Sequence, residues 1–251
     1  MHALDDVSED ALAAGAAPPQ RWVYTDGSHK QGGNRSQRKK GADGPAGWAA
    51  VTIANDHVSG SKRVVHARSG RVVITPGEPG YRGATRHSNN TGELTALLEA
   101  ILDERARPAG TVAFCVDSTY AINVATGKWR ARPANGELTR RLRAAARALI
   151  LERGAPSVRF QHVRAHIGVP GNETADALAK AAVEQAWMCG ATPVVLLYAR
   201  DAYARAVSAG AGAGSGRPPN QTRDPCRDQT RVRQRDAQPG VRMVGLQLGV
   251  G

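Results

Sequence analysis

The sequence predicts an α/β fold in which helices flank a mixed five-stranded sheet, and two observations lead to this prediction. Short apolar runs rich in β-favouring residues alternate with segments in which apolar residues recur every three to four positions. The order of these segments is three strands, a helix, a strand, two helices, a strand and a helix. Such an order is typical of a mixed sheet covered by helices.

The first three expected strands follow one another as a meander. Residues 22–25 form an apolar run that ends at Asp26-Gly27, and residues 47–53 form the second run. The third expected strand covers residues 63–65 and 71–75, with a break at Ser69-Gly70.

The later elements are predicted from periodicity and from residues that end helices. The strongest helix has apolar residues spaced for one buried face, and Pro108 and Gly110 end it. Residues 111–116 form a fourth strand, followed by a short helix, and residues 158–164 form a fifth strand. The last helix begins after Asn172. The apolar faces of the two long helices are Leu94, Leu97, Leu98, Ile101 and Leu102, and then Leu138, Leu142, Ala145, Ala146 and Leu149.

The chain divides into one expected folded domain and the segments on either side of it. Residues 21–187 carry nearly all the periodicity, whereas residues 1–20 form an acidic N-terminal extension that we expect to be disordered. Residues 188–208 are an extension of uncertain structure, in which residues 193–207 could hold a short strand and a helix. Residues 209–251 are basic and rich in Gly, Pro and polar residues, which favours a disordered tail.

Charge and composition narrow the classes of function. The chain has 251 residues, with 34 Lys and Arg against 22 Asp and Glu, for a formal net charge of +12. This excess favours a polyanionic partner, and the alternative is that the charge serves solubility alone. No apolar stretch approaches the roughly 18 residues of a membrane span, and the acidic N-terminus argues against a secretory signal. Three widely spaced cysteines favour neither disulfides nor a zinc site, so we expect an intracellular protein.

Four acidic residues stand where expected strands or helices begin or end. Asp26 and Asp117 follow the first and fourth strands, Glu93 lies in the first turn of the strongest helix, and Asp176 lies near the start of the last helix. Neighbouring parallel strands would bring Asp26 and Asp117 together, where like charges raise each other's pKa. Divalent cations relieve such repulsion, and clustered carboxylate oxygens suit Mg²⁺ or Mn²⁺.

Each acid also has a purely structural alternative. Glu93 lies three residues after Asn90 and could complete a helix-capping arrangement. Asp176 could be a first-turn acid that complements the helix dipole, and Asp117 before Ser118 could be an ordinary helix entry. Asp26 before Gly27 could belong to a turn. Four acids together at the ends of these elements are poorly explained by these alternatives.

Four segments of the chain carry motifs that belong together. In chain order they are Thr25-Asp26-Gly27-Ser28, Asn89-Asn90-x-x-Glu93-Leu94, Asp117-Ser118-x-Tyr120 and His166-x-Gly168-x-Pro170-Gly171-Asn172-Glu173-x-x-Asp176. Together they resemble the signatures of the type 1 ribonuclease H family, and the likeness runs from about residue 22 to residue 180. The segment from His166 to Asp176 is the most specific of the four.

The resemblance implies a ribonuclease H-like fold and an endonuclease that cuts the RNA strand of RNA–DNA hybrids. It implies two Mg²⁺ ions, with Mn²⁺ as a substitute, and products with 5′-phosphate and 3′-hydroxyl ends. Carried over, Asp26 bridges both ions, Asp176 helps hold the ion that activates water, and Glu93 and Asp117 hold the ion at the leaving oxygen. His166, in a loop with Gly and Pro, assists proton transfer or product departure, and the alternative is a surface histidine without a role.

The resemblance also implies contacts with the nucleic acid. Asn89 and Asn90 match polar residues that contact the 2′-hydroxyl groups of RNA. The basic residues around Trp129 match a patch that binds the phosphates of the DNA strand. Asn89 and Asn90 could instead only form a turn. The expected contact residues are Gly27, Ser28, Asn89, Asn90, Thr119, Lys128, Trp129, Arg130, Arg132 and Asn172.

The chain departs from the family pattern in ways that leave its setting open. Residues 127–135 are too few for the basic handle helix of bacterial members, and residues 1–20 are too few for an N-terminal hybrid-binding domain. Either a retroelement or viral version or a free-standing member, acting as a monomer, fits this pattern. A catalytically silent nucleic-acid-binding domain of a retroelement or viral assembly is the alternative function. We also expect the basic run of residues 35–40 to contact nucleic acid, and the alternatives are a solvated loop or a basic run of the nuclear-localisation type.

Overall fold

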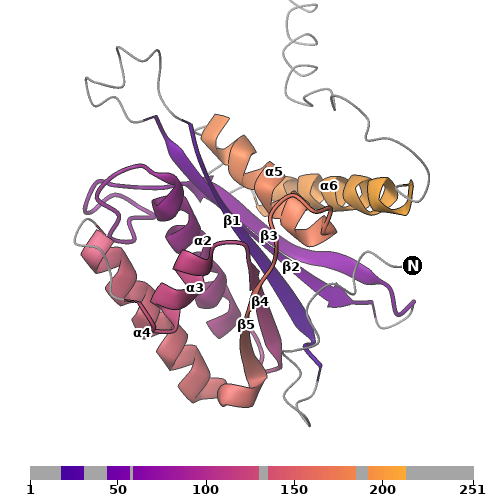
Figure 1. The fold of residues 1–251 in the computed structure, drawn as a ribbon, viewed down its shortest axis with the longest axis horizontal. Coiled ribbons are helices and arrows are strands. Elements are labelled where there is room, and N and C mark those ends of the chain that lie inside the picture. The colour runs from indigo at the N-terminus through magenta and orange to yellow at the C-terminus, as the bar shows by residue number, and fades with distance from the viewer. Residues whose placement is uncertain (1–17, 31–43, 57–58, 130–134, 185–191, 213–251) are drawn as a thin grey trace, which may run out of the picture. The chain divides into compact units, whose positions relative to one another are not determined.

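A single five-stranded sheet with the order β3-β2-β1-β4-β5 forms the centre of the fold in a computed structural model (Figure 1). The model describes residues 18–30, 44–56, 59–129, 135–184 and 192–212. Strands β1, β2 and β3 pair antiparallel, whereas β4 and β5 extend the sheet parallel to β1. The mixed five-stranded sheet predicted from the sequence is therefore confirmed. The strands are β1 (Arg21–His29), β2 (Ala46–Asn55), β3 (Lys62–Arg71), β4 (Val112–Val116) and β5 (Val158–His162).

Helices cover both faces of this sheet (Figure 1). One face carries α2, α3 and α4, whose apolar residues pack with Val23 and Phe114 of the sheet in one core cluster. The other face carries α5 and α6, which pack around Tyr24 in a second cluster. The two amphipathic helices expected before the fifth strand correspond to α2 and α4. The helices are α2 (Asn89–Arg105), α3 (Thr119–Ala125), α4 (Gly136–Arg153), the 3₁₀ turn η3 (Ala155–Ser157), α5 (Pro170–Glu184) and α6 (Thr192–Gly212).

Strand β1 is the central strand, and it is paired unequally on its two sides. It pairs with β2 along its whole length, from Arg21 to His29, but with β4 only as far as Thr25. The expected end of the strand before a turn at residues 26 and 27 is wrong, because β2 continues to pair with β1 beyond that point. Residues 26–29 thus form an edge that is open on the β4 side.

Strand β3 also differs from its prediction. The expected break at Ser69-Gly70 is absent, because both residues pair with β2. A side chain at Gly70 would begin 3.3 Å from the indole nitrogen of Trp48, so this glycine makes room for the ring. The expected strand over residues 71–75 ends at Arg71, because β2 begins at Ala46, whose carbonyl accepts the last hydrogen bond of this ladder from the Val72 backbone at 2.8 Å.

Among the described residues after α5, residues 192–212 form the helix α6, and the short strand expected over residues 193–207 is absent. In α6, Ala199 and Tyr203 are buried in the cluster that includes residues of β3 and α5. The Arg200 guanidinium donates to the backbone carbonyl of Val64 at 3.3 Å. Because α6 reaches Gly212, residues 209–212 are helical and not part of a disordered tail. Residues 1–17, the basic run 35–40 and residues 213–251 lie outside the described residues.

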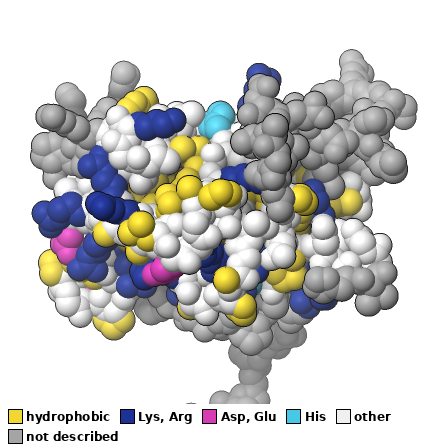
Figure 2. All heavy atoms as spheres, turned by 90° about the horizontal axis from the view of Figure 1, so that it is seen from below, with side chains coloured by type: hydrophobic (Ala, Val, Ile, Leu, Met, Phe, Trp, Pro, Cys, Tyr) yellow, Lys and Arg dark blue, Asp and Glu magenta, His cyan; other side chains and the backbone are white. Residues whose placement is uncertain are grey.

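The surface is basic over a broad area. Figure 2 shows a face on which Lys and Arg side chains gather with few acidic side chains between them. Two of the described acids are buried and neutralised: Glu104 by Arg21 and Arg153 at 3.0 and 3.1 Å, and Glu99 by Arg82. These acids therefore contribute little negative charge to the surface.

Two further expectations concern membranes and cysteines. Among the described helices, none has the length and apolar character needed to cross a membrane. Cys115 of β4 is buried and carries a free thiol, whereas Cys189 and Cys226 lie outside the described residues.

Gly27 provides a test of how α2 is held against the sheet. A β-carbon at Gly27 would lie 2.1 Å from the backbone nitrogen of Glu93 and 2.3 Å from the carbonyl carbon of Gly92. We expect Gly27→Ala to push the start of α2 away from β1 and to lower the free energy of unfolding by about 1–3 kcal/mol. Gly136→Ala is the matched control, because a β-carbon there meets no atom within 4 Å. Urea unfolding curves that coincide for the two variants would contradict this close packing.

Candidate active site

A pocket of about 440 Å³ opens where β1 and β4 stop pairing and where α2 and α5 begin. It contains the four predicted acids and the predicted histidine. Residues from both faces of the sheet contribute to its wall. The lining residues are Asp26, Gly27, Ser28, His29, Asn89, Glu93, Asp117, Ser118, Ala165, His166, Asp176 and Lys180.

Asp26 and Asp117 are placed by the two parallel strands. Thr25 and Val116 are the last paired residues of β1 and β4, so the two aspartates stand side by side immediately beyond that pair. Asp26 is 6% exposed and lies within β1, which excludes the turn alternative. Helix α3 is capped by Ser118, whose hydroxyl accepts from the Ala121 backbone at 3.2 Å, so Asp117 is not needed as a cap.

Glu93 is free of the capping role that the sequence left open. Helix α2 is capped by Ser88, whose hydroxyl accepts from the Thr91 backbone, while the Thr91 hydroxyl accepts from the Ser88 backbone at 2.8 Å. This reciprocal pair is a complete capping box. Glu93 is 6% exposed in the pocket and accepts from the Asn89 amide at 3.4 Å. Its carboxylate is therefore available to the cluster of acids.

Asp176 does not fit the structural alternative of a first-turn acid that complements the helix dipole. Helix α5 begins at Pro170, so Asp176 lies in the second turn, where the helix dipole no longer accounts for an acid. The Lys180 ammonium donates to the Asp176 carboxylate at 2.7 Å.

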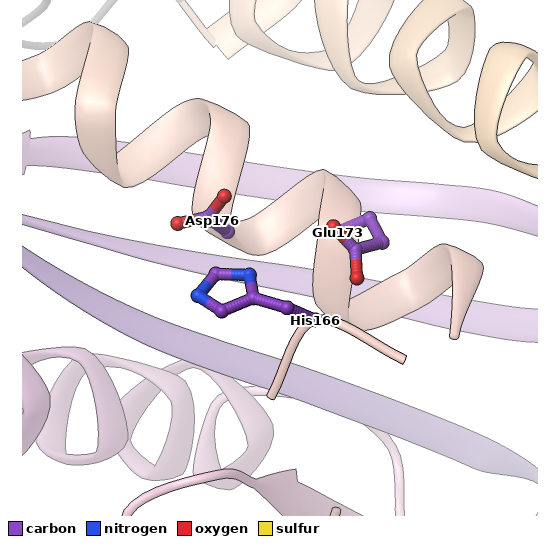
Figure 3. Close-up of side chains that lie close together, drawn as sticks. All are labelled: His166, Glu173 and Asp176. Carbon is purple, nitrogen blue, oxygen red and sulfur yellow. The ribbon is translucent and has the colours of Figure 1, made fainter. Parts of the chain in front are cut away.

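Two sets of ligand-type side chains lie at this pocket, and all their members except Glu173 line it. The carboxylate oxygens of Asp26, Glu93 and Asp117 lie within 4.8 Å of one another, and so do ligand atoms of His166, Glu173 and Asp176. Figure 3 shows the His166 ring directed from its loop towards Asp176, with Glu173 on the same helix as Asp176.

The loop that carries His166 is tied to the helix behind it. The Gly168 backbone donates to the Glu173 carboxylate at 3.3 Å. His166 itself has a left-handed backbone, with φ of 56°, a conformation that is uncommon for a residue other than glycine. The backbone path of the loop thus sets the direction of the imidazole.

Burial and mutual repulsion disfavour the ionised forms of the acids. Burial raises the pKa of Asp26 to about 8, and the charges of Asp117 and Asp176 add to this effect. Burial, followed by the charges of Asp26 and Asp117, raises the pKa of Glu93 well above its ordinary value. Burial also raises the pKa of Asp117, while a hydrogen bond from Asn172 opposes the increase. A cation in the pocket would favour the ionised forms of all three groups.

The oxygen atoms of the acids fit a divalent metal. Glu93 Oε2 and Asp117 Oδ1 are buried and form no hydrogen bond with any residue that the structure describes. Buried carboxylate oxygens without partners are unfavourable unless a cation binds them. Hard oxygen ligands of this kind suit Mg²⁺ and Mn²⁺. The residues present are thus compatible with metal binding by the cluster.

The residues expected to contact nucleic acid lie partly in the pocket and partly on the exposed surface outside it. Gly27, Ser28 and Asn89 line the pocket, whereas Asn90 and Thr119 are exposed in the first turns of their helices. Lys128 and Trp129 are exposed after α3, and the Trp129 ring lies 6.4 Å from that of Tyr120. Arg130 and Arg132 lie outside the described residues.

Asn172 does not lie where a substrate contact is expected. Its side chain is 1% exposed, and its amide lies 3.5 Å from the Asp117 carboxylate, to which it donates. The structure therefore gives Asn172 a role in holding Asp117, which its neighbours in sequence did not indicate.

Three residues of the site had no role in the sequence pattern. His29 and Lys180 line the pocket, and the spacing of Lys180 four residues after Asp176 could have indicated its ion pair. His162 is exposed at the end of β5, and its Nε2 lies 3.1 Å from the Asp117 carbonyl oxygen. The strand's last residue thus supports the backbone of a pocket acid.

Comparison with known proteins agrees with this geometry. The family model described as RNase H matches residues 18–184 of the chain. The chain belongs to the ribonuclease H family. A protein named ribonuclease H from Polaromonas naphthalenivorans (strain CJ2) is 31% identical over 193 residues, which cover 72% of this chain and 98% of that protein. A ribonuclease H from Nitratidesulfovibrio vulgaris (strain DP4) is 33% identical over 165 residues, covering 63% of this chain and 86% of the relative.

A solved structure also shares the fold of this ribonuclease H. LC9-RNase H1, described as a type 1 RNase H with the type 2 active-site motif, superposes with a TM-score of 0.51 at 22% identity. The match covers 76% of this chain and 85% of that protein. The family assignment makes the chain a hydrolase of phosphodiester bonds, as the sequence motifs predicted.

The raised pKa of Asp26 can be tested by measuring the thermal stability of the protein at two pH values. Its pKa in the folded protein, about 8, lies above the ordinary value of 3.8, so its contribution to stability is full below about pH 4 and is lost as pH rises towards 8. In EDTA, we expect Asp26→Asn to melt near the wild-type temperature at pH 4 and about 10 °C or more above it at pH 8. One pKa unit corresponds to about 1.4 kcal/mol, and each kcal/mol shifts melting by roughly 2–4 °C.

The control for this comparison is Asp201→Asn, on the exposed surface of α6. Thermal melting in EDTA at both pH values should not separate this variant from the wild type. An Asp26→Asn protein that is less stable than the wild type at pH 8 would contradict the repulsion between the acids.

Proposed function

We propose that this ribonuclease H is an endonuclease that hydrolyses the RNA strand of RNA–DNA hybrids and leaves 5′-phosphate and 3′-hydroxyl ends. We further propose that it uses two Mg²⁺ ions, for which Mn²⁺ can substitute. The observation that carries the proposal is that Asp26, Glu93, Asp117 and Asp176 line one pocket, and that Glu93 Oε2 and Asp117 Oδ1 are buried there without a hydrogen bond to any described residue.

The acids divide between two metal positions. Glu93 and Asp117 would hold one ion and Asp176 the other, with Asp26 shared between them. The placement of Asp26 supports this role, because the charges of both Asp117 and Asp176 act on its carboxylate. Two such ions supply Lewis-acid stabilisation of the attacking and leaving oxygens of an in-line phosphoryl displacement.

The remaining polar residues orient these ligands and move a proton. Asn172 donates to Asp117 and so directs one of its oxygens, while the other stays free. Lys180, which also lines the pocket, forms an ion pair with the Asp176 carboxylate at 2.7 Å. His166 lies on an exposed loop within reach of Asp176, and it would transfer a proton or assist product departure.

The nucleic-acid partner is proposed from charge and from the residues around the pocket. The net charge of +12 and the basic face in Figure 2 favour a polyanion. Gly27, Ser28 and Asn89 line the wall where a minor groove could present 2′-hydroxyl groups, with Asn90 and Thr119 beside them. Lys128 and Trp129 would contact the DNA strand, together with Arg130 and Arg132. The monomeric state, the intracellular setting and the domain limits stay predictions.

Cleavage assays on two duplexes test the function. With Mg²⁺, we expect cutting of the labelled RNA strand in RNA–DNA, and no cutting of DNA–DNA. Asp117→Asn should abolish cleavage while hybrid binding is kept or improved, because the change removes a metal ligand and also relieves repulsion between carboxylates. Measurable cleavage by Asp117→Asn, or a wild type that binds hybrids without cutting them, would contradict the proposal. The second outcome is the one expected of a silent binding domain.

His166→Ala tests whether the histidine is auxiliary. We expect single-turnover cleavage to slow by about 10²–10⁴-fold, the usual contribution of a proton-transferring side chain, while remaining measurable because the acids are intact. His66→Ala is the comparison and should leave cleavage unchanged, because that ring bonds Asp103 at 3.1 Å and is not among the residues that line the pocket. A loss as complete as that of Asp117→Asn would assign His166 a larger role.

A further inference from the structure

Arg143 of α4 is a basic residue to which the proposed function gives no part. Its neighbour Arg141 pairs with Glu137 at 2.6 Å on the surface of the same helix. Arg143 is instead half-buried and reaches α3, against which α4 packs (Figure 1). Its Nε donates to the backbone carbonyl of Val124 at 3.0 Å, and its Nη2 donates to that of Trp129. One guanidinium thus connects α4 to two points of the segment that ends α3.

The segment after α3 is a tight turn that brings Trp129 back to the helix. Gly127 has a left-handed backbone, with φ of 78°, and its N–H donates to the Val124 carbonyl at 3.1 Å. The Trp129 N–H donates to the Asn123 carbonyl at 3.0 Å. Because Arg143 bonds the Trp129 carbonyl, both backbone polar groups of Trp129 are fixed, one by α3 and the other by α4.

The side chain of Trp129 is supported on one side and open to solvent on the other. Its ring lies 6.4 Å from that of Tyr120, with 47° between the two planes. The Trp129 side chain is 49% exposed, whereas Trp48 in the sheet is 7% exposed. Lys128, the residue before it, is also exposed. A fixed aromatic side chain that stays exposed is typical of a contact with a binding partner.

We propose that Arg143 is a positioning residue, which fixes Trp129 in the orientation that contacts the DNA strand of the hybrid. A guanidinium suits this task, because its planar fork donates from two nitrogens at fixed positions. A contact side chain that is already immobilised loses little conformational entropy on binding, so the tether raises affinity. This inference rests on the proposed function, in which Trp129 contacts that strand.

The variant Arg143→Lys separates the tether from the charge. Lysine keeps the positive charge, but its single nitrogen cannot reproduce a contact made by two nitrogens. Arg147→Lys is the matched control, because Arg147 lies one turn later on α4 and is exposed. Each change is made with and without Trp129→Ala, in the Asp117→Asn background with Mg²⁺, so that binding is measured without cleavage. Hybrids labelled on the DNA strand are titrated by fluorescence anisotropy.

We expect Arg143→Lys to weaken hybrid binding by about 3–10-fold and Arg147→Lys to leave it unchanged. Trp129→Ala should weaken binding by about 10-fold, and Arg143→Lys should then add less than about 2-fold, because the side chain that it positions is gone. In the protein that retains Asp117, Arg143→Lys should raise KM and leave kcat unchanged.

Two results of these titrations would overturn the proposal. Full affinity in Arg143→Lys would mean that only the charge at this position matters, as for a direct contact with phosphate. An equal loss with and without Trp129 would mean that Arg143 acts through another group.

A measurement on the free protein makes the outcome independent of the substrate. In protein labelled with 5-fluorotryptophan, the ¹⁹F resonance that disappears in Trp129→Ala should shift in Arg143→Lys and stay in place in Arg147→Lys. In the wild type, the Nε–H of Arg143 should exchange with water more slowly than that of Arg147. An unmoved resonance, or equal exchange rates, would overturn the inference.

A failure of the proposed function looks different. Trp129→Ala would then bind the hybrid as tightly as the protein with Trp129, while the ¹⁹F resonance still shifted in Arg143→Lys. That result would remove the contact with the DNA strand, and with it the binding role of Arg143, but it would keep the tether between α4 and Trp129.

Discussion

Repulsion between buried carboxylates is the interaction on which the organisation of this protein depends. Asp26 and Asp117 stand together because two parallel strands stop pairing at the same point, and Glu93 is brought to them by α2. Burial raises the pKa of all three groups, so the cluster favours bound protons when no cation offsets its charge. The same property that destabilises the ionised acids gives them affinity for divalent cations.

Several features elsewhere in the fold keep this cluster assembled. Gly27 lets the start of α2 lie against β1, and the Ser88–Thr91 capping box leaves Glu93 unoccupied by helix capping. Asn172 and His162 hold the side chain and the backbone of Asp117, one from each neighbouring element. These contacts offset the repulsion locally, and the two core clusters on either side of the sheet supply the stability that the acids do not.

The sequence predicted those parts of the structure that depend on local pattern. Leu94, Leu97 and Ile101 recur at helical spacing, and the apolar run before Asp117 indicated a buried strand, so the sheet and the main helices followed from periodicity. The end of β1 did not, because His29 is held in the strand by Ala46, a residue distant in sequence. The role of Asn172 was missed for the same reason: burial beside Asp117 depends on how α5 packs. Motifs located the acids, but only tertiary contacts decided what each polar neighbour does.

The ionisation of Asp26 is the most direct measurement of the central claim. Its side-chain carboxyl ¹³C resonance can be followed by NMR against pH, first in EDTA and then with saturating Mg²⁺. The account predicts a midpoint near the raised pKa of about 8 in EDTA and a much lower midpoint when the metal is bound. A midpoint in EDTA near the ordinary value of 3.8 would contradict it, because Asp26 would then be neither desolvated nor repelled by its neighbours.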